Sequence, residues 1–432
     1  MDINTLYQIF LQCNGVTTDS RHCPQGSLFI ALKGDTFNGN AFAAQALKDG
    51  CAYAVVDEPA YAPKDDHRYL LTDNCLKTLQ ELARYHRRQL GTRIIGITGT
   101  NGKTTTKELM AAVLSQAYNL LYTQGNLNNH IGVPLTLLRL RADHDLAVVE
   151  MGASHPGDIQ ELVDIAEPDY GLITNVGKAH LEGFGSFEGV MRTKGELFDF
   201  LRQRRDSTVF VHRDNPYLCK MAGGLNPIYY GSEDGLYVNG RVTDNSPFLA
   251  FEWKAGREEQ WHKVQTHLIG DYNFANALAA VTVGRFFGVE PQKTDRALEE
   301  YIPQNNRSQL LQTGDNTLII DAYNANPTSM RASIGNFRNM KADNKMLILG
   351  DMRELGKESA EEHQAVVDYL EECGFRDVLL VGSQFAATRH SYPTYPDAAA
   401  LAEHLKADKP QGKTILIKGS NGIHLSSVVE YL

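Results

Sequence analysis

Little in the sequence points to an extracellular, membrane-spanning or disulfide-stabilised protein. The 6 cysteines are scattered and no two form a C-x-x-C pair, which argues against a disulfide framework or a zinc site. No apolar run approaches ~18 residues, so we expect no membrane span. The start, MDINTLYQIF, has neither a basic segment nor a long apolar one. We therefore expect no signal peptide and a cytoplasmic protein with reduced thiols.

The charge pattern also excludes some classes. Lys and Arg total 42 against 52 Asp and Glu, a net charge of −10, and no block of like charge stands out. We therefore expect neither nucleic acid nor an anionic membrane as a partner. The hydrophobic content of 42% and the length of 432 residues fit a globular protein of two to four domains. Any site for an anion must be built from local groups.

The segment TGTNGKTTT at 98–106 is the clearest functional signal. An apolar, β-branched run at 93–97 precedes it and a helical pattern follows, which predicts a strand, a Gly-rich turn and a helix. This arrangement is typical of a phosphate-binding loop, with Lys103 on the terminal phosphates and the Thr104 hydroxyl on Mg²⁺. Ile97 stands where the strict motif has glycine. The residues expected to bind the nucleotide here are Gly99, Thr100, Asn101, Gly102, Lys103, Thr104 and Thr105.

We expect an α/β fold of three domains, each with its own sheet. Residues 1–91 predict a small α/β domain, with strands at 27–32 and 51–56. Asp73 would cap a helix that ends at Gly91. Residues 92–303 predict a central P-loop ATPase-like domain with a parallel sheet.

Residues 304–432 predict a third domain of Rossmann-like type. Apolar runs alternate with helical stretches there, which is the signature of a parallel sheet. Polar clusters follow three of these runs, and ligands bind beyond the carboxyl ends of parallel strands. The expected strands lie at 318–321, 346–350, 378–382 and 414–418, and the polar clusters at 321–327, 350–356 and 418–422.

Several single residues of the central domain have two interpretations. Glu150 ends an apolar strand pattern and fits a Mg²⁺ ligand or a solvated carboxylate. His180 fits a hydrogen-bonded residue at the rim or a metal ligand. Composition alone indicates that Lys194 is a surface lysine. Asn273 and Asn276 would share a helix face, where they could contact adenine, or Asn273 could cap the helix.

Taken together, the motifs resemble the Mur ligase family of bacterial cell-wall synthesis. The resemblance covers essentially the whole chain and rests on GTNGKTTT, EMGAS, NVGKAHLEGFGS, TKGEL, GDYNFANALAA, DAYNANPTSM, GDMRELG and KGS. YNANPTSM, GDMRELG and GNLNNHIGVPLT (125–136) are similar to the branch that adds D-alanyl-D-alanine to UDP-N-acetylmuramoyl-tripeptide. The DNPR segment typical of the branch that adds the third residue is absent.

This resemblance implies an ATP- and Mg²⁺-dependent amide ligase that works through an acyl phosphate. It implies catalytic roles for Lys103, Glu150, His180 and Lys194, the last being a lysine that is often carbamylated in the family. The implied metal ligands are Thr104, Glu150, His180 and Lys194. Cations suit this chemistry, because the substrate carboxylate and the γ-phosphate are both anionic.

The resemblance also implies where the substrates bind. Asn273 and Asn276 match positions beside adenine, Arg307 matches a phosphate contact and Asp321 a ribose contact. His130 and Asn421 depart from the family, which commonly has Glu and Arg there. The residues matching the uridine-diphosphate site are Asp19, Ser20, Arg21, Asn38 and Gly39, and those matching the muramyl-peptide path are Asn126, Asn128 and Asn129.

Two alternatives remain open from the sequence. One is a related amide ligase, either the branch that adds the third residue or a folylpolyglutamate synthase. The other is a P-loop NTPase that performs no synthesis, since a shared loop does not fix a function. For the ligase we expect small-molecule substrates, no nucleic acid, no membrane insertion, a monomeric state, and closure of the third domain over ATP.

Overall fold

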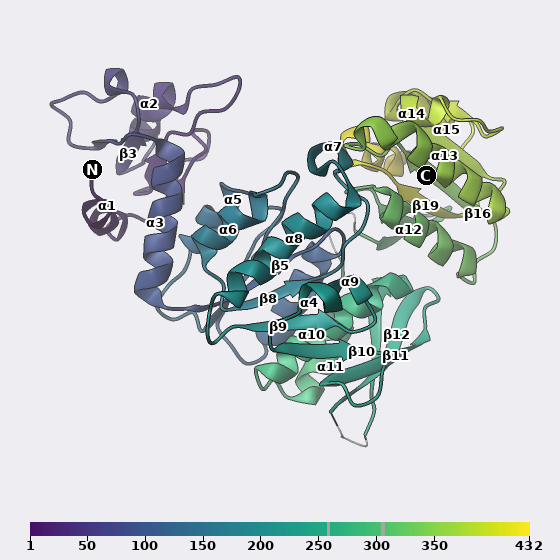
Figure 1. Ribbon diagram of the computed structural model, residues 1–432. Helices are drawn as coiled ribbons and strands as arrows, with labels where there is room; N and C mark the ends of the chain where they lie inside the picture. The colour runs from purple at the N-terminus through teal and green to yellow at the C-terminus, as the bar shows by residue number, and fades with distance from the viewer. Residues whose placement is uncertain (257–259, 304–306) are drawn as a thin grey trace.

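Three sheets, each flanked by helices, follow one another along the chain in the computed structural model (Figure 1), which describes residues 1–256, 260–303 and 307–432. This is the three-domain α/β class expected from the sequence. The expected boundary between 303 and 304 falls at 304–306, outside the described residues, and the boundary at 91 stays a prediction. Within the described ranges, no helix is long and apolar enough to cross a membrane. The 6 cysteines are free thiols, as expected.

The N-terminal unit is built on a parallel sheet in the order β1-β2-β3-β4. Its last helix, α3, begins after Asn74, whose side chain accepts a hydrogen bond from the Lys77 amide, so the expected cap at Asp73 is wrong by one residue. Gly91 ends α3 in the left-handed conformation, as predicted. The elements, with 3-10 helices written η, are α1 (Ile3–Phe10), β1 (Val16–Thr17), β2 (Leu28–Ile30), η1 (Gly39–Phe42), α2 (Ala43–Lys48), β3 (Tyr53–Val56), η2 (Pro59–Tyr61), β4 (Tyr69–Leu71) and α3 (Cys75–Leu90).

The central unit has a larger sheet in the order β13-β12-β11-β10-β9-β8-β5-β7-β6. Pairing is parallel from β6 to β11 and antiparallel in the β11-β12-β13 extension. The elements are β5 (Arg93–Thr98), α4 (Lys103–Leu114), β6 (Leu120–Tyr122), α5 (Gly132–Leu137), β7 (Leu146–Glu150), α6 (Asp158–Ala166), β8 (Tyr170–Ile173), α7 (Leu181–Phe184), α8 (Phe187–Arg202), β9 (Thr208–His212), α9 (Pro216–Met221), β10 (Pro227–Gly231), β11 (Val238–Asp244), β12 (Phe248–Ala255), β13 (His262–Ile269), η3 (Asp271–Asn273), α10 (Phe274–Phe286) and α11 (Pro291–Glu300).

The phosphate-loop motif lies between β5 and α4, as predicted. Strand β5 pairs in parallel with β7 on one side and β8 on the other. The carboxyl ends of these three strands therefore face the same edge of the sheet. Glu150 is the last residue of β7, so the pairing of β7 with β5 places its carboxylate next to the phosphate loop.

The C-terminal unit has a sheet in the order β14-β15-β19-β16-β17-β18, parallel except for the β14-β15 pair. The expected strand at 414–418 matches β19, and the other three expected strands match within one residue at their ends. The elements are β14 (Gln309–Gln312), β15 (Thr317–Asp321), α12 (Pro327–Asn339), β16 (Lys345–Gly350), η4 (Gly356–Glu358), α13 (Ser359–Glu372), β17 (Val378–Val381), α14 (Ser383–Ala386), β18 (Thr394–Tyr395), α15 (Ala398–Ala407), β19 (Thr414–Lys418), η5 (Asn421–Ile423) and η6 (Leu425–Tyr431).

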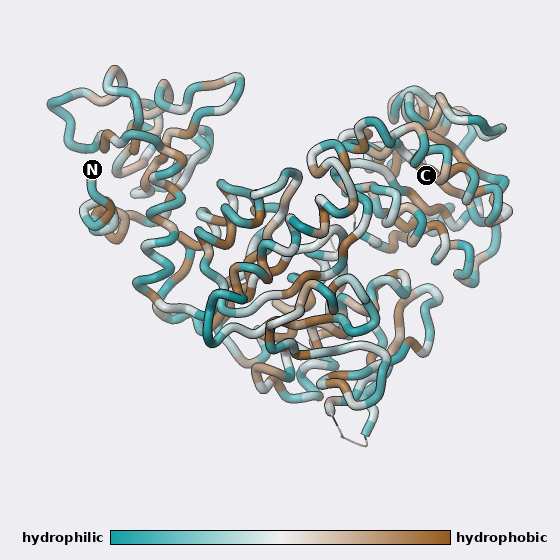
Figure 2. The backbone as a smooth tube through the Cα atoms, in the orientation of Figure 1, coloured by the Kyte–Doolittle hydropathy of each residue, from teal (hydrophilic) through white to brown (hydrophobic). Residues whose placement is uncertain are grey.

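Apolar packing connects the units as well as filling them. Figure 2 shows apolar stretches gathered inside each unit and hydrophilic ones along the outer loops. One continuous buried cluster runs from the N-terminal sheet through α3 to α5 and α6. A second cluster joins α7 to the C-terminal unit, because Leu181 and Phe184 pack with Met352 and Leu355.

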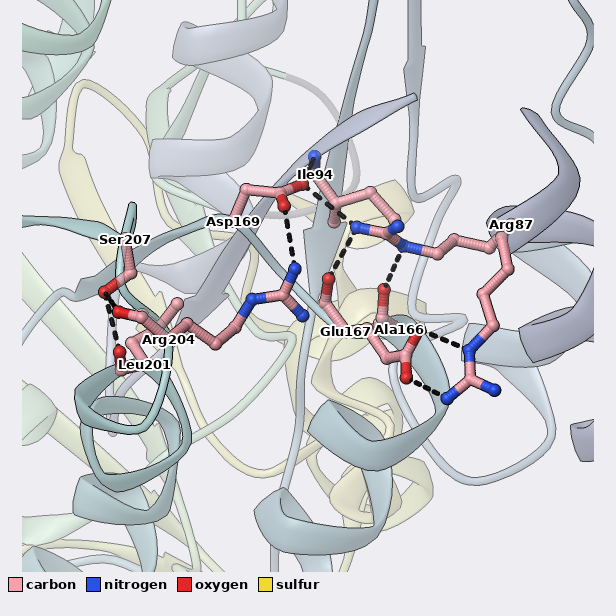
Figure 3. Close-up of polar contacts among 9 residues, drawn as sticks. Arg87, Ile94, Ala166, Glu167, Asp169, Leu201, Arg204 and Ser207 are labelled. Carbon is pink, nitrogen blue, oxygen red and sulfur yellow. Dashed lines mark hydrogen bonds and ion pairs between the residues drawn. The ribbon is translucent and has the colours of Figure 1, made fainter. Parts of the chain in front are cut away.

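The junction between α3 and the central unit also carries a buried ion pair (Figure 3). The Arg87 guanidinium, 9% exposed, donates to the carbonyls of Ala166 and Glu167 at 3.1 and 2.7 Å and to Asp169 at 3.0 Å. Asp169 also accepts from the Ile94 amide at 2.9 Å and from Arg204 at 3.2 Å. This network fixes the end of α3 against the start of β5.

We predict that Arg87→Ala lowers the free energy of unfolding by about 2–4 kcal/mol, because it leaves a partly buried carboxylate and two carbonyls short of a donor. The neighbouring Arg88→Ala removes an exposed pair with Glu167 and should cost at most about 1 kcal/mol. Tryptophan fluorescence during urea unfolding measures both, since Trp253 and Trp261 lie in the central unit. Equal shifts in the two variants would contradict this assignment.

Candidate active site

A cavity of about 650 Å³ lies between the central and C-terminal units, against the phosphate loop. It also takes residues from the end of β7, the start of α10, the end of β15, and α12. The predicted site residues that line it are Thr100, Asn101, Gly102, Lys103, Thr104, Thr105, Asn128, Asn129, Glu150, His180, Asn273, Asn276, Arg307 and Asp321. The predicted site residues outside its lining are Gly99, Asn126, Lys194, Asp19, Ser20, Arg21, Asn38 and Gly39.

The backbone of the phosphate loop requires its glycines. Gly99 and Gly102 have φ of 141° and 78°, a region unfavourable for other residues. A Cβ on Gly99 would lie 2.1 Å from Thr174 Oγ1, and one on Gly102 would lie 2.6 Å from Asn276 Oδ1. Helix α4 begins at Lys103, so its amide-rich N-terminus faces the cavity, which suits an anion.

Lys103 folds back over this loop. Its Nζ donates to the carbonyls of Gly99 at 2.9 Å and Thr100 at 3.0 Å. Burial lowers the pKa of Lys103 to about 8, although the Glu150 carboxylate opposes that shift. The ammonium is thus poorly solvated, and a phosphate oxygen would be a better partner than the two carbonyls.

Glu150 offers a buried oxygen to a cation. The residue is 1% exposed, and its Oε1 accepts from Thr104 Oγ1 at 3.1 Å and Asn128 Nδ2 at 2.8 Å. Its Oε2 is buried with no hydrogen-bond partner. A carboxylate oxygen in that position fits a hard divalent ion such as Mg²⁺, with the Thr104 hydroxyl beside it.

His180 faces the C-terminal unit instead. It lies at φ 50°, and its Nδ1 is 2.5 Å from Oε2 of Glu354, which has φ 63°. This contact lowers the pKa of the Glu354 carboxyl. Across the described ranges, no three His, Cys, Asp or Glu side chains are grouped to hold a metal, so hydroxyl and phosphate oxygens would complete any ion site.

Lys194 is not the surface lysine that composition indicates. It lies on α8, 2% exposed, with Nζ 3.3 Å from the Ala153 carbonyl and 5.3 Å from the centre of the Phe184 ring. Burial, and then the positive charge of Lys103, lower the pKa of Lys194 well below its usual value. Burial therefore favours the neutral amine more than in an exposed lysine.

Asn273 and Asn276 form a chain of amides. Asn273 donates to the Ile269 carbonyl and accepts from Asn276, at 2.8 and 2.9 Å, and Asn276 accepts from Thr106 Oγ1 at 3.1 Å. Asn273 makes no side-chain capping bond, so the helix-cap alternative is wrong. The chain fixes α10 against α4, and contact with adenine stays a prediction.

The C-terminal side of the cavity carries an arginine stacked on a tyrosine ring and an aspartate paired with a lysine. The Arg307 guanidinium stacks 3.8 Å from the centre of the Tyr323 ring. Asp321 accepts from the buried Lys418 ammonium at 2.6 Å and from Ser333 Oγ at 3.3 Å. Asp321 and Arg307 thus both lie on the cavity wall opposite the phosphate loop.

Several residues that line the cavity were not singled out from the sequence, among them Tyr272, Tyr323, Glu354 and Lys418. Tyr272 lies within hydrogen-bond distance of Ser308, and burial raises the pKa of its phenol. Tyr323, Glu354 and Lys418 lie within the DAYNANP, GDMRELG and KGS segments, so the motifs contained the signal. Their partners lie on other strands and loops, which a lone Tyr, Glu or Lys does not reveal.

The residues predicted to bind uridine diphosphate lie in the N-terminal unit. Asp19 and Arg21 pair with each other at the surface, and Arg21 lowers the pKa of Asp19 to about 2. Asn38 donates to Glu58 at 3.0 Å. A Cβ on Gly39 would lie 2.2 Å from the Leu32 carbonyl oxygen.

The residues predicted along the peptide path lie in the loop before α5. Asn128 donates to Glu150, and Asn129 Oδ1 accepts from the Gly132 amide at 2.8 Å. Asn126 is exposed. Asn128 thus links the predicted peptide path to the Glu150 carboxylate.

Comparison with known proteins agrees with this architecture. Sequence models match in three parts: "Mur ligase family, catalytic domain" at 12–87, "Mur ligase middle domain" at 97–284, and "Mur ligase, glutamate ligase domain" at 306–421. The UDP-N-acetylmuramoyl-tripeptide--D-alanyl-D-alanine ligase of Bacillus subtilis is 35% identical over 97% of this chain and 93% of its own length.

Solved structures agree as well. A crystal structure of MurF from Acinetobacter baumannii superposes with a TM-score of 0.86 at 29% identity, covering 99% of this chain and 97% of that one. MurF ligase from Thermotoga maritima in complex with ADP gives 0.85 at 26% identity, covering 98% and 97%.

The fold and the cavity define a three-domain, nucleotide-binding α/β protein whose site lies between its second and third domains. The chain belongs to the Mur ligase family.

We predict that Lys103→Met abolishes ligation but stabilises the nucleotide-free protein by about 1–2 kcal/mol at pH 7, because a charge poorly solvated in the fold is removed. The folded pKa of about 8 lies below the usual 10.5, so the wild-type penalty is full below pH 8. It fades as the pH rises from 8 to 10.5, and the two proteins should converge there. Urea unfolding with EDTA at several pH values measures this, and a less stable variant at pH 7 would contradict it.

Proposed function

We infer that this chain is an ATP-dependent ligase that joins D-alanyl-D-alanine to UDP-N-acetylmuramoyl-tripeptide and releases ADP and phosphate. This is a step of peptidoglycan precursor synthesis. The observation that carries the inference is the cavity, which puts a phosphate loop and an unpartnered carboxylate oxygen opposite the GDMRELG and DAYNANP segments of the third domain. The near full-length similarity to ligases of that activity supports the choice of substrates.

The reaction begins between two anions, the γ-phosphate of ATP and the carboxylate of the tripeptide. We propose that Lys103 and the N-terminal amides of α4 bind the phosphates, which reduces their repulsion of the carboxylate. Glu150 and Thr104 would hold Mg²⁺, which supplies further positive charge to the transferring phosphoryl group. Arg307 would bind phosphate from the other wall, while Asp321 would accept from the ribose.

The tripeptide carboxylate would take the γ-phosphoryl group, with ADP leaving, to form an acyl phosphate. The amine of D-alanyl-D-alanine would then attack its acyl carbon, so that an amide bond forms, the bond to phosphate breaks and the amine loses a proton. An acyl phosphate hydrolyses readily, so water must be kept from it. The cavity has walls from two domains, which supports the proposal that closure of the third domain excludes water.

We further propose that Lys194 becomes a carbamate: its neutral amine adds to CO₂, an N–C bond forms and one amine proton is released. The change converts an amine into an anionic oxygen ligand, and His180 with Glu150 would complete the same side of the site. The low pKa of Lys194 supports the first step, since only a neutral amine adds to CO₂.

The remaining substrate contacts are proposals of the same kind. The uridine diphosphate would bind at Asp19–Arg21 and Asn38–Gly39, and the peptide would pass Asn126, Asn128 and Asn129. Asn273 and Asn276 would contact adenine with the hydrogen-bonding capacity that their chain leaves unused. We also propose that the protein is monomeric and works in the cytoplasm, where its nucleotide substrates are made.

An amine-donor panel tests the function. With ATP, Mg²⁺ and UDP-N-acetylmuramoyl-tripeptide, we expect phosphate release with D-alanyl-D-alanine and at most background with diaminopimelate, lysine or glutamate. Activity only with the last three would reject this assignment in favour of a related amide ligase. ATP hydrolysis that needs no amine would favour the NTPase alternative.

For Lys194→Ala we predict a loss of ligation of at least ~100-fold, at the upper end for removing a partner of a metal site. Acetate or propionate should restore part of the activity by replacing the carbamate. Lys263→Ala is the control, because Lys263 is exposed on β13, where it pairs with Glu252, and should show neither loss nor rescue. Full wild-type activity without CO₂, together with no rescue, would count against carbamylation.

A further inference from the structure

The fourth residue of the phosphate loop, Asn101, is fixed through its backbone by its own domain. Its amide donates to Asn175 Oδ1 at 3.0 Å. Its carbonyl accepts from Thr174 Oγ1 at 2.6 Å and Asn175 Nδ2 at 3.0 Å. Because these bonds use only the backbone of Asn101, its side-chain amide is free to bond elsewhere.

That side chain pairs with an amide of the C-terminal unit. Asn326 Nδ2 donates to Asn101 Oδ1 at 2.7 Å, and Asn101 Nδ2 donates to Asn326 Oδ1 at 3.3 Å. The two residues are 225 positions apart, and the pair joins the phosphate loop directly to the third domain. We call it the amide pair.

Asn326 is itself held firmly. It is 4% exposed and caps α12, accepting from the Ser329 amide at 2.9 Å while its own amide donates to Ser329 Oγ at 3.1 Å. The cap uses Oδ1 alone, so it does not explain why Nδ2 points at Asn101. Asn326 does not line the cavity, whereas Asn101 does, so Asn326 can affect a nucleotide only through its neighbours: Asn101 and the wall that includes α12.

The amide pair also joins the phosphate loop to the opposite wall of the site. Asp321 at the end of β15, and Thr328, Ser329 and Ser333 on α12, form the wall opposite the loop. Asn326 lies between these two groups in the chain. Holding Asn326 against Asn101 therefore holds that wall at a fixed distance from Lys103.

We propose that Asn326 is a positioning residue for ATP: it completes the phosphate loop from the third domain, so that nucleotide affinity depends on docking of that domain. The proposal rests on the proposed use of ATP at this loop. When the pair is broken, each amide bonds to water instead of to the other amide. The loop and the opposite wall can then move apart, which weakens the contacts that the nucleotide makes with both.

The test is a double-variant cycle of Asn326→Ser, Asn101→Ser and both together. Serine is a good helix cap, so Asn326→Ser keeps the start of α12 and removes both amide bonds to Asn101. Titration calorimetry with Mg²⁺ and a non-hydrolysable ATP analogue gives Kd, and ligation assays give kcat at saturating ATP. We expect Asn326→Ser to raise Kd roughly 3- to 10-fold, the range for one net hydrogen bond, with kcat and the Kd of UDP-N-acetylmuramoyl-tripeptide within about 2-fold.

The double variant should bind the analogue no more weakly than the weaker single variant, because the second change removes a partner already lost. Asn215→Ser is the matched control, since Asn215 caps α9 and, like Asn326, precedes a proline. It should leave the Kd unchanged.

An unchanged Kd in Asn326→Ser, or effects that multiply in the double variant, would overturn the proposal. An equal rise in the Kd of the ATP analogue and of UDP-N-acetylmuramoyl-tripeptide would also overturn it. If the wild-type chain binds the analogue but performs no ligation, the proposed function is rejected. The Kd values of the single and double variants would still decide the role of the amide pair. A wild-type chain that binds no analogue rejects both.

Discussion

The structure depends on three ionisable groups around one loop, of which Glu150 and Lys194 are buried and Lys103 is partly buried. Lys103, Lys194 and Glu150 lie at the carboxyl edge of the central sheet, and the fold gives them fewer partners than their charges require. Desolvation of this kind is unfavourable unless a ligand supplies the missing charges. The strained glycines, the amide chain of α10 and the register of β7 all hold these groups where polyphosphate and a cation would satisfy them. The site is thus unfavourable when empty and favourable when filled.

The elements that the sequence predicts well are those fixed by neighbours in the chain. The strand, turn and helix around 98–106 and the strand at 414–418 have clear local patterns, and they appear where expected. Asn74 caps α3 in place of Asp73, because two adjacent residues can both cap and only the backbone geometry decides. Lys194 was placed on the surface by composition, since nothing local shows that Phe184 and Ala153 cover it. Glu354 and Lys418 were missed for a related reason: their partners, His180 and Asp321, are more than 90 residues away.

The two junctions of the molecule differ in kind. Helix α3 shares a continuous apolar cluster with the central unit, and the Arg87 network closes its end. The C-terminal unit contacts the central one through α7 and through polar links, among them the amide pair, the His180–Glu354 contact and the Lys178–Glu362 pair. Polar links exchange readily with water, whereas apolar burial does not. Although α7 also packs apolarly at the second junction, that junction has several contacts that water can replace, which supports the proposed closure of the third domain.

The continuous core beneath α3 has a consequence for substrate choice. If uridine diphosphate is anchored at Asn38 and Gly39, as proposed, then the distance from that anchor to the phosphate loop is set by α3 and cannot adjust freely. A peptide that is one residue too short would leave its carboxylate away from the γ-phosphate, and a longer one would overshoot it. The fixed position of the N-terminal unit would then select acceptors by peptide length, independently of the side chains that the peptide carries.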